Sequence, residues 1–209
     1  LIDQGNYGSV EKNYLVWRDY ILQFGIGKKL EIDLPNELGG LLPTVSLYDK
    51  YYGSGHWKSS TIISLAIGQG ELGVTPLQMA NTMAIIANRG FYYSPHLIKA
   101  IGKNQVKKET YTTKHLVKID SSYFNVVIDG MQQVVDHGTA TYAKIADIPM
   151  CGKTGTAQNS HGKSHSVFVA FAPRNNPKIA IAVIVENSGY GSTWAAPIAS
   201  LLVEKYIKD

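Results

Sequence analysis

The chain has 209 residues, 44% of them hydrophobic, which is sufficient for one buried core, so we expect one domain and no second domain. No run of 18 or more uncharged apolar residues occurs, and therefore no membrane-spanning helix is expected in this sequence. A net charge of only +4, without a known nucleic-acid-binding module, argues against nucleic acid as a partner.

The first third of the sequence predicts one helix followed by long loops. Residues 13–23 are expected to be helical, with Asn13 as the N-cap and Gly25 as the stop. Residues 25–60 are rich in Gly, Pro, Tyr and Ser, and we expect long ordered loops there with short pieces of structure.

Thr75-Pro76-Leu77-Gln78 is the clearest helix start in the chain. Thr75 suits the N-cap, Pro76 suits the first helical position, and Gln78 completes a capping box. The helix is expected to end at Gly90. Its predicted core-facing residues recur at helical spacing: Leu77, Ala80, Met83, Ala84 and Ala87.

Residues 91–120 are expected to form strand and hairpin material bearing solvated lysines: Lys99, Lys103, Lys107, Lys108 and Lys114. The next helix should be capped by Ser121 or Ser122 and should stop near Gly138. Its expected apolar face contains Phe124, Val127, Ile128, Met131, Val134 and Val135.

The C-terminal part predicts three strands, at residues 150–159, 165–173 and 178–187, joined as antiparallel hairpins by short Gly, Asn and Pro connections. The third strand is almost continuously apolar, and we expect it to be central. A last helix should run from Trp194 or Ala195 to Lys208. The fold class is therefore predicted to be α+β, with an antiparallel sheet packed by helices. The residues of the last helix that should face the sheet are Ile198, Leu201, Leu202 and Ile207.

The segment Lys153-Thr154-Gly155-Thr156 combines a cation, two hydroxyls and a backbone position without a side chain. Its β-branched threonines favour an extended strand, on which Thr154 and Thr156 share one face and Lys153 lies on the other or at the edge. Such an edge could hold a carboxylate while a backbone N–H points at a developing oxyanion. The preceding Cys151 is expected to be a small buried residue rather than a reactive thiol.

Gly-Lys-Thr is also found in phosphate-binding loops, and that alternative is disfavoured. The loop needs a further glycine at position 147, which is Asp, and Thr-Gly-Thr opens a helix poorly. Taken alone, the segment could still be an ordinary Gly-containing strand. His161 and His165 are four residues apart, but their loop setting with an intervening glycine does not favour a metal site.

Lys-Thr-Gly is one of three motifs of the serine penicillin-binding and β-lactamase group. The flanking sequence resembles the class B penicillin-binding proteins, above all the elongation type known as penicillin-binding protein 2. The resemblance covers the length of the chain and is carried by ordered phrases: Phe24-Gly25-Ile26-Gly27, Ile32-Asp33-Leu34-Pro35-Asn36-Glu37, Ala66-Ile67-Gly68-Gln69-Gly70, Val74-Thr75-Pro76-Leu77-Gln78, Ala87-Asn88-Arg89-Gly90, Gly138-Thr139-Ala140, Gly152 to Gln158, and Ala195-Ala196-Pro197-Ile198-Ala199.

The resemblance implies a partial transpeptidase fold, with residues 1–209 as the C-terminal portion of a penicillin-binding domain. The implied activity is that of a peptidoglycan D,D-transpeptidase, which crosslinks stem peptides through a serine acyl-enzyme and is acylated by β-lactams, without a metal or cofactor. The implied partner is a membrane glycosyltransferase of the elongation machinery. The implied location is the extracytoplasmic face of the bacterial cytoplasmic membrane, with an N-terminal anchor helix outside this chain.

The resemblance also implies roles for the residues of the motif. Lys153 would supply positive charge to proton transfer and attract the terminal carboxylate of the substrate, and Thr154 and Thr156 would bind that carboxylate. The Thr156 N–H would form half of the oxyanion hole, and Gly155 would leave room for the ligand. The residues expected to line the far edge of the site are Ala157 and Gln158.

The other two motifs of the family, a nucleophilic Ser-x-x-Lys and a Ser-x-Asn, are not recognisable. Ser-x-Asn does not occur, and we interpret Ser9-x-x-Lys12 and Ser160-x-x-Lys163 as chance matches. Tyr123-Phe124-Asn125 is interpreted as helix packing. We expect a chain that starts after the missing motifs, although a homologue without the nucleophile fits too. A division-type transpeptidase, a serine β-lactamase or β-lactam sensor, and a non-catalytic cell-wall scaffold remain alternatives.

Overall fold

The computed structural model describes residues 7–105 and 109–209, which form two compact units. The first unit comprises residues 7–75 and 95–105, and the second comprises residues 76–94 and 109–209. Of the helices in these ranges, none is both long and apolar enough to cross a bilayer.

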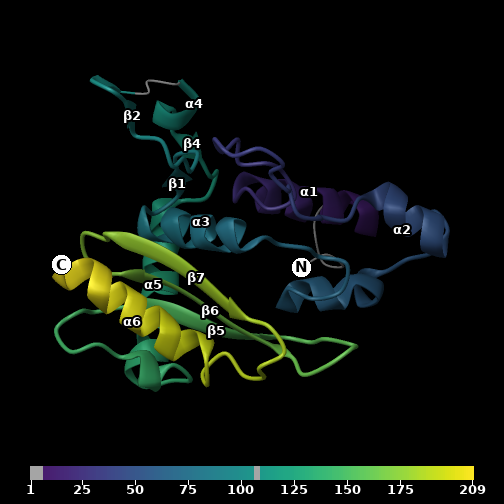
Figure 1. Ribbon diagram of the computed structural model, residues 1–209. Helices are drawn as coiled ribbons and strands as arrows, with labels where there is room; N and C mark the ends of the chain where they lie inside the picture. Colours follow the sequence, from purple (N-terminus) through teal and green to yellow (C-terminus); the bar gives the residue numbers. More distant parts are fainter. Residues whose placement is uncertain (1–6, 106–108) are drawn as a thin grey trace. The chain divides into compact units, whose positions relative to one another are not determined.

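The first unit contains helices α1 (Val10–Gln23) and α2 (Val45–Tyr52), the 3₁₀ helix η1 (Ser59–Ile67) and a hairpin of β2 (Ala100–Ile101) with β3 (Asn104–Gln105) (Figure 1). Its core is aromatic, because the rings of Tyr14, Tyr48 and Trp57 lie within 5.2–5.7 Å of one another. The Trp57 Nε1–H donates to Asp49 at 2.8 Å, which satisfies its one polar group.

Two sequence predictions for the first unit were wrong in detail. Helix α1 begins three residues earlier than predicted, because the Ser9 hydroxyl, and not Asn13, caps it by accepting the Lys12 N–H. Asn13 is a buried residue inside the helix. Helix α2 falls among the short pieces of structure expected within residues 25–60, but its position was not predicted, although Thr44 caps it in the same way by accepting the Leu47 N–H.

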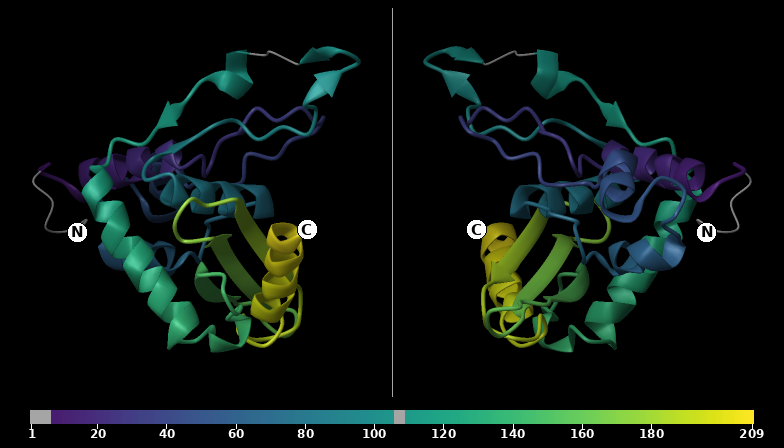
Figure 2. Two further views of the ribbon diagram at one scale, coloured as in Figure 1. Left: turned by 90° about the vertical axis from the view of Figure 1, so that its left-hand side faces the viewer. Right: turned by 90° about the vertical axis from the view of Figure 1, so that its right-hand side faces the viewer.

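The second unit is built on an antiparallel sheet with the strand order β5 (Cys151–Ala157), β6 (His165–Ala172) and β7 (Ile179–Val185). Helix α6 (Ala195–Lys208) covers one face, and α3 (Pro76–Ala87) and α5 (Ser121–Asp136) cover the other (Figure 2). The predicted α+β class, the three strands and the helix start at Pro76 are confirmed. The unit also contains the short elements β1 (Phe91–Tyr92) paired with β4 (His115–Leu116), α4 (Glu109–Thr112) and η2 (Thr141–Ala143).

The expectation that the third strand is central was wrong, because β6 lies between the other two strands. Strand β7 is apolar because helices cover both of its faces. Its Ile181 and Val183 pack against the cluster that includes α6, and its Ala180 packs against the cluster that includes α3. A continuous apolar run therefore reports two covered faces and not the position in the sheet.

The buried faces of two helices differ from the predicted ones. Helix α6 buries its small residues Ala195, Ala196, Ala199 and Val203, and it leaves Leu201 68% exposed. Small side chains let the helix backbone approach the sheet closely, so Leu201 turns outward, whereas Ile207 packs against the cluster as predicted. Helix α3 buries Met83 and Ala87 as predicted, but it also buries Gln78 and Asn81 and leaves Leu77 exposed.

Helix α5 follows the prediction more closely. Its N-cap is Asp120, which accepts the Ser122 N–H, and not Ser121 or Ser122 as predicted. Phe124 is buried, which agrees with the interpretation of Tyr123-Phe124-Asn125 as part of the packed face of this helix. In the lysine-bearing segment, Lys99, Lys103 and Lys114 are exposed, whereas Lys107 and Lys108 lie outside the described residues.

Candidate functional site

The candidate site lies on β5, at one edge of the three-stranded sheet. Each residue of β5 is paired with β6, from Cys151 opposite Phe171 to Ala157 opposite His165. In the described part of the chain no strand pairs with the other side of β5. An edge strand presents backbone N–H and C=O groups that can bind an extended peptide.

The two faces of β5 can be assigned from the residues that pack on each. Cys151 belongs to the cluster formed with α3 and α5, so by alternation Lys153 and Gly155 lie on that face. Thr154 and Thr156 lie on the face covered by α6. The Lys153 and Thr156 side chains are exposed, whereas Thr154 is half-buried.

The Lys153 ammonium donates a hydrogen bond to the backbone carbonyl oxygen of the next residue, Thr154, at 2.7 Å. Among the described residues, Lys153 forms no ion pair with a carboxylate. The edge of β5 therefore carries a positive charge that no acidic side chain of this part of the chain neutralises, and such a charge attracts an anionic ligand.

Thr139 is a site residue that the sequence analysis did not assign. Its hydroxyl oxygen lies 2.8 Å from that of Thr154, so the two hydroxyls are hydrogen-bonded. Gly138 must be glycine here, because a Cβ would lie 2.8 Å from the Cα of Val134. The phrase Gly138-Thr139-Ala140 marked this segment by resemblance, but only the structure brings Thr139 next to β5.

The remaining predicted residues have less defined places. A Cβ on Gly155 would meet the Cβ of Val167 at 3.3 Å, which leaves little room on that face. Ala157 ends β5, and Gln158 follows it as an exposed residue. Cys151 is buried as predicted, and this burial raises the pKa of its thiol to about 11, which disfavours the reactive thiolate.

Neither Ser-x-x-Lys segment forms a nucleophile and base pair. The Ser9 hydroxyl caps α1 by accepting the Lys12 N–H, and the Lys12 side chain is exposed. Ser160 and Lys163 are both exposed in the turn between β5 and β6. A nucleophilic serine of this type needs its base within hydrogen-bond reach, and no such contact is seen for these serines.

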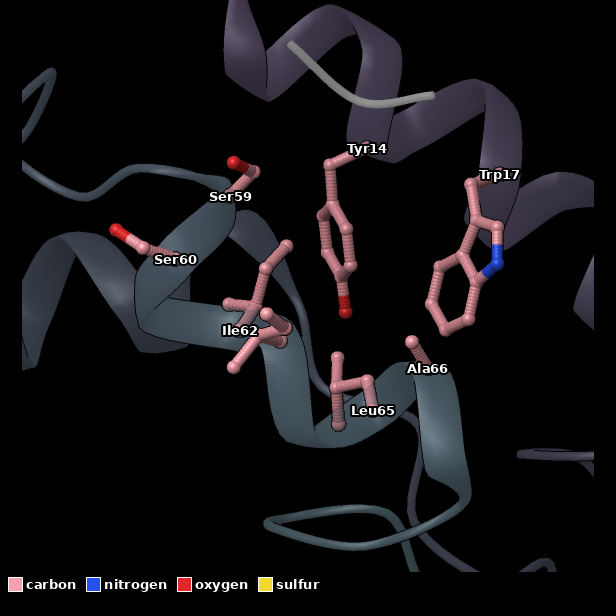
Figure 3. Close-up of a pocket in the computed structure, with 8 residues that line it drawn as sticks. Tyr14, Trp17, Ser59, Ser60, Ile62, Leu65 and Ala66 are labelled. Atoms are coloured by element: carbon pink, nitrogen blue, oxygen red, sulfur yellow. The ribbon is translucent and has the colours of Figure 1, made fainter.

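The first unit contains a cavity of about 340 Å³ between α1 and η1. Figure 3 shows Tyr14 and Trp17 of α1 facing Ile62 and Leu65 of η1 across this space. The lining includes two serine hydroxyls but no carboxylate, amine, imidazole or thiol. This cavity can therefore bind an apolar group, whereas the edge of β5 presents an ammonium group and threonine hydroxyls.

Comparison with known proteins agrees with this geometry. The penicillin-binding protein transpeptidase domain family matches residues 12–204. The peptidoglycan D,D-transpeptidase MrdA of Haemophilus influenzae is 32% identical over 91% of this chain, and this chain spans 32% of its length. The chain thus covers about a third of the length of such curated relatives.

Solved structures show the same fold. The structure of Pseudomonas aeruginosa PBP2 in complex with WCK 5153 superposes with a TM-score of 0.80 at 35% identity, over 92% of this chain and 42% of that chain. The structure of the complex between PBP2 and MreC from Helicobacter pylori superposes with a TM-score of 0.76 at 27% identity, over 91% of this chain and 35% of that chain. The chain therefore belongs to the penicillin-binding protein transpeptidase family, within which it is similar to penicillin-binding proteins 2.

Proposed function

We propose that this chain is the C-terminal, carboxylate-binding portion of a peptidoglycan D,D-transpeptidase of the elongation type. The observation that carries the proposal is the edge strand β5, which presents the Lys153 ammonium and the Thr139–Thr154 hydroxyl pair, with no ion pair from Lys153 to a carboxylate among the described residues. The names of the relatives support the same activity, since MrdA of Haemophilus influenzae is a peptidoglycan D,D-transpeptidase.

The proposed reaction uses a serine supplied by a part of the protein outside this chain. Its hydroxyl oxygen attacks the carbonyl carbon of a terminal D-Ala-D-Ala, an acyl-enzyme forms, and the last D-alanine leaves with a proton on its amine. The amine of a second stem peptide then attacks the ester, which forms the crosslink and releases the serine. A β-lactam acylates the same serine, but the resulting ester is hydrolysed only slowly.

Within this chain the residues have distinct proposed tasks. Thr154 and Thr156 donate hydroxyl hydrogen bonds to the substrate carboxylate, and Thr139 orients the hydroxyl of Thr154. Lys153 stabilises the anion and the proton transfer. The backbone N–H of Thr156 stabilises the oxyanion, and such a donor is worth about 3 kcal/mol in the transition state. Ala157 and Gln158 extend the strand along which the peptide lies.

We also propose the wider setting that the family resemblance implies. A membrane glycosyltransferase of the elongation machinery would be the partner, at the extracytoplasmic face of the cytoplasmic membrane. The structure of Helicobacter pylori PBP2 with MreC shows that a similar protein assembles with another protein.

The proposal is tested by labelling with a fluorescent penicillin followed by denaturing electrophoresis. The 209-residue chain alone should remain unlabelled, whereas the same chain behind a segment with Ser-x-x-Lys and Ser-x-Asn should be labelled. A covalent band on the chain alone that Ser9→Ala or Ser160→Ala abolishes would show that the nucleophile is in this chain. No labelling of the longer protein would refute the proposed activity.

A further inference from the structure

We infer that Ser166 is a positioning residue for the carboxylate-binding strand, acting through the loop that joins β7 to α6. The inference rests on the proposed function for its catalytic consequence, and on contacts within the second unit for its structural part. Ser166 lies on β6 directly opposite Thr156.

Ser166 is an exception on its face of the sheet. The neighbouring β6 residues on the α6 side are Phe168, Ala170 and Ala172, and all of them are buried in the apolar cluster. Ser166 is also completely buried, and a buried hydroxyl is costly unless it is hydrogen-bonded. A polar side chain at this position therefore requires a specific pair of partners.

Both hydrogen-bonding capacities of the Ser166 hydroxyl are used by the loop. The hydroxyl donates to the carbonyl oxygen of Tyr190 at 2.8 Å and accepts the N–H of Ala195, the first residue of α6, at 3.1 Å. One side chain thus fixes both ends of the segment 190–195. Gly189 adds a backbone bond to the carbonyl oxygen of Ser164 at 2.8 Å.

Between its bonds to Ser166, the loop segment 190–195 lies directly on β5. A Cβ on Gly191 would come within 2.2 Å of the carbonyl oxygen of Val167 and 2.5 Å of that of Gly155. The Val167 side chain points to the α3 and α5 face, and a side chain at position 155 would point there too. On the α6 face these two positions therefore present only backbone, and Gly191 packs against it. The loop therefore supports the backbone of Gly155 on the α6 face, next to Thr156, whose N–H the reaction would use.

The consequence is that Ser166 controls how firmly the Gly155–Thr156 backbone is held. Without its hydroxyl, the Tyr190 carbonyl and the Ala195 N–H lose a buried partner and the loop separates from β5. Small displacements of groups that position a substrate reduce rates strongly, so about a tenfold loss of the acylation rate constant is expected.

The test compares Ser166→Ala with the matched control Ser188→Ala. Ser188 is in the same loop and donates to the carbonyl oxygen of Val185, but it makes no bond to β6. Hydrogen–deuterium exchange of the longer protein that carries this chain should accelerate about tenfold in the peptide 151–157 for Ser166→Ala, and only around residues 185–189 for Ser188→Ala. Ser166→Cys replaces the hydroxyl by a somewhat larger thiol that hydrogen-bonds only weakly, and it serves as a second variant should Ser166→Ala not fold.

The catalytic readout is the second-order rate constant of acylation by benzylpenicillin. The concentration of active protein is taken from the amount of acyl-enzyme formed when labelling is complete. This normalisation removes any loss of folded protein. Ser166→Ala should lower the constant about tenfold and Ser188→Ala by less than about twofold. Unchanged exchange in 151–157, or changed exchange with an unchanged rate constant, would overturn the inference. A wild-type protein that is never acylated would refute the proposed function instead, and the exchange data would still decide whether Ser166 holds the strand.

Discussion

The loop of residues 30–37 and strand β5 are held in place by different forces. In the loop, the Glu37 carboxylate accepts three consecutive backbone N–H groups, at residues 30–32. Strand β5 is held by its hydrogen-bonded pairing with β6 and by the burial of Cys151 and Gly152. A carboxylate can accept backbone N–H groups where no neighbouring strand is present to pair with them. The conformation of such a loop then depends on the ionisation of that carboxylate.

Asp33 shows the same dependence. Its carboxylate accepts the N–H groups of Leu97 and Ile98, at 2.8–2.9 Å, and so joins two distant segments of the first unit. The N–H groups of Ile98 and Leu97 lower the pKa of Asp33 below its ordinary value, because they stabilise the ionised form. In β5, by contrast, the charge of Lys153 is exposed and available for a ligand.

Lys153→Ala gives the sharpest separation of charge from packing. Because packing holds β5, the free energy of unfolding should change by less than about 0.5 kcal/mol. Acylation of the longer protein by penicillin should nevertheless slow by about a hundredfold or more, since an electrostatic contribution to the transition state is lost. Stopped-flow acylation and chemical denaturation of the same variant measure the two effects, and an unchanged acylation rate would remove Lys153 from the mechanism.

Gly152→Ala tests whether packing holds β5. The added Cβ would lie 2.4 Å from the Phe168 ring, which is completely buried and cannot move aside. The free energy of unfolding should fall by about 1–3 kcal/mol. The control is Gly130→Ala in α5, where a Cβ meets nothing within 4 Å, and which should stabilise the helix by up to about 1 kcal/mol. Equal effects of the two substitutions in urea denaturation would contradict the packing account.

Acidification tests the charge-dependent region and should have the smallest effect. Because the folded pKa of Asp33 is lowered, its contribution to stability is present above the unfolded value of about 4 and is lost as the pH falls through the folded pKa. Hydrogen exchange at Leu97 and Ile98 should therefore lose protection below about pH 4, while the amides of β5 keep theirs. Asp33→Asn should show the faster exchange already at neutral pH, and equal acid sensitivity in both regions would remove the contrast.

The sequence allowed β5 and the start of α3 to be predicted because local chemistry determines both. Thr154 and Thr156 favour extended backbone, and Thr75-Pro76 favours a helix start, whatever surrounds them. The outward position of Leu201 on α6 could not be predicted from periodicity. Which side of a helix packs depends on how closely it approaches the sheet, and the alanines of α6 allow a close approach.

Two features of the site could not be predicted from the sequence, because they depend on contacts between residues that are distant in the chain. The contact between Thr139 and Thr154 joins segments 15 residues apart, and no pattern within either segment encodes their distance. Ser166 reads as one polar residue in a strand, and only the fold shows that its hydroxyl reaches Tyr190 and Ala195. The order of the strands was not predicted either, since the apolar run in β7 has two covered faces although β7 lies at the edge of the sheet in the described part of the chain.

The most direct test of the central claim is a crystal structure of the longer protein acylated by a penicillin. The account predicts that the carboxylate of the drug lies within hydrogen-bond distance of the Thr154 and Thr156 hydroxyls, with the acyl carbonyl oxygen facing the Thr156 N–H. A carboxylate bound elsewhere, with β5 making no contact to the drug, would contradict the assignment of this edge as the anion-binding site.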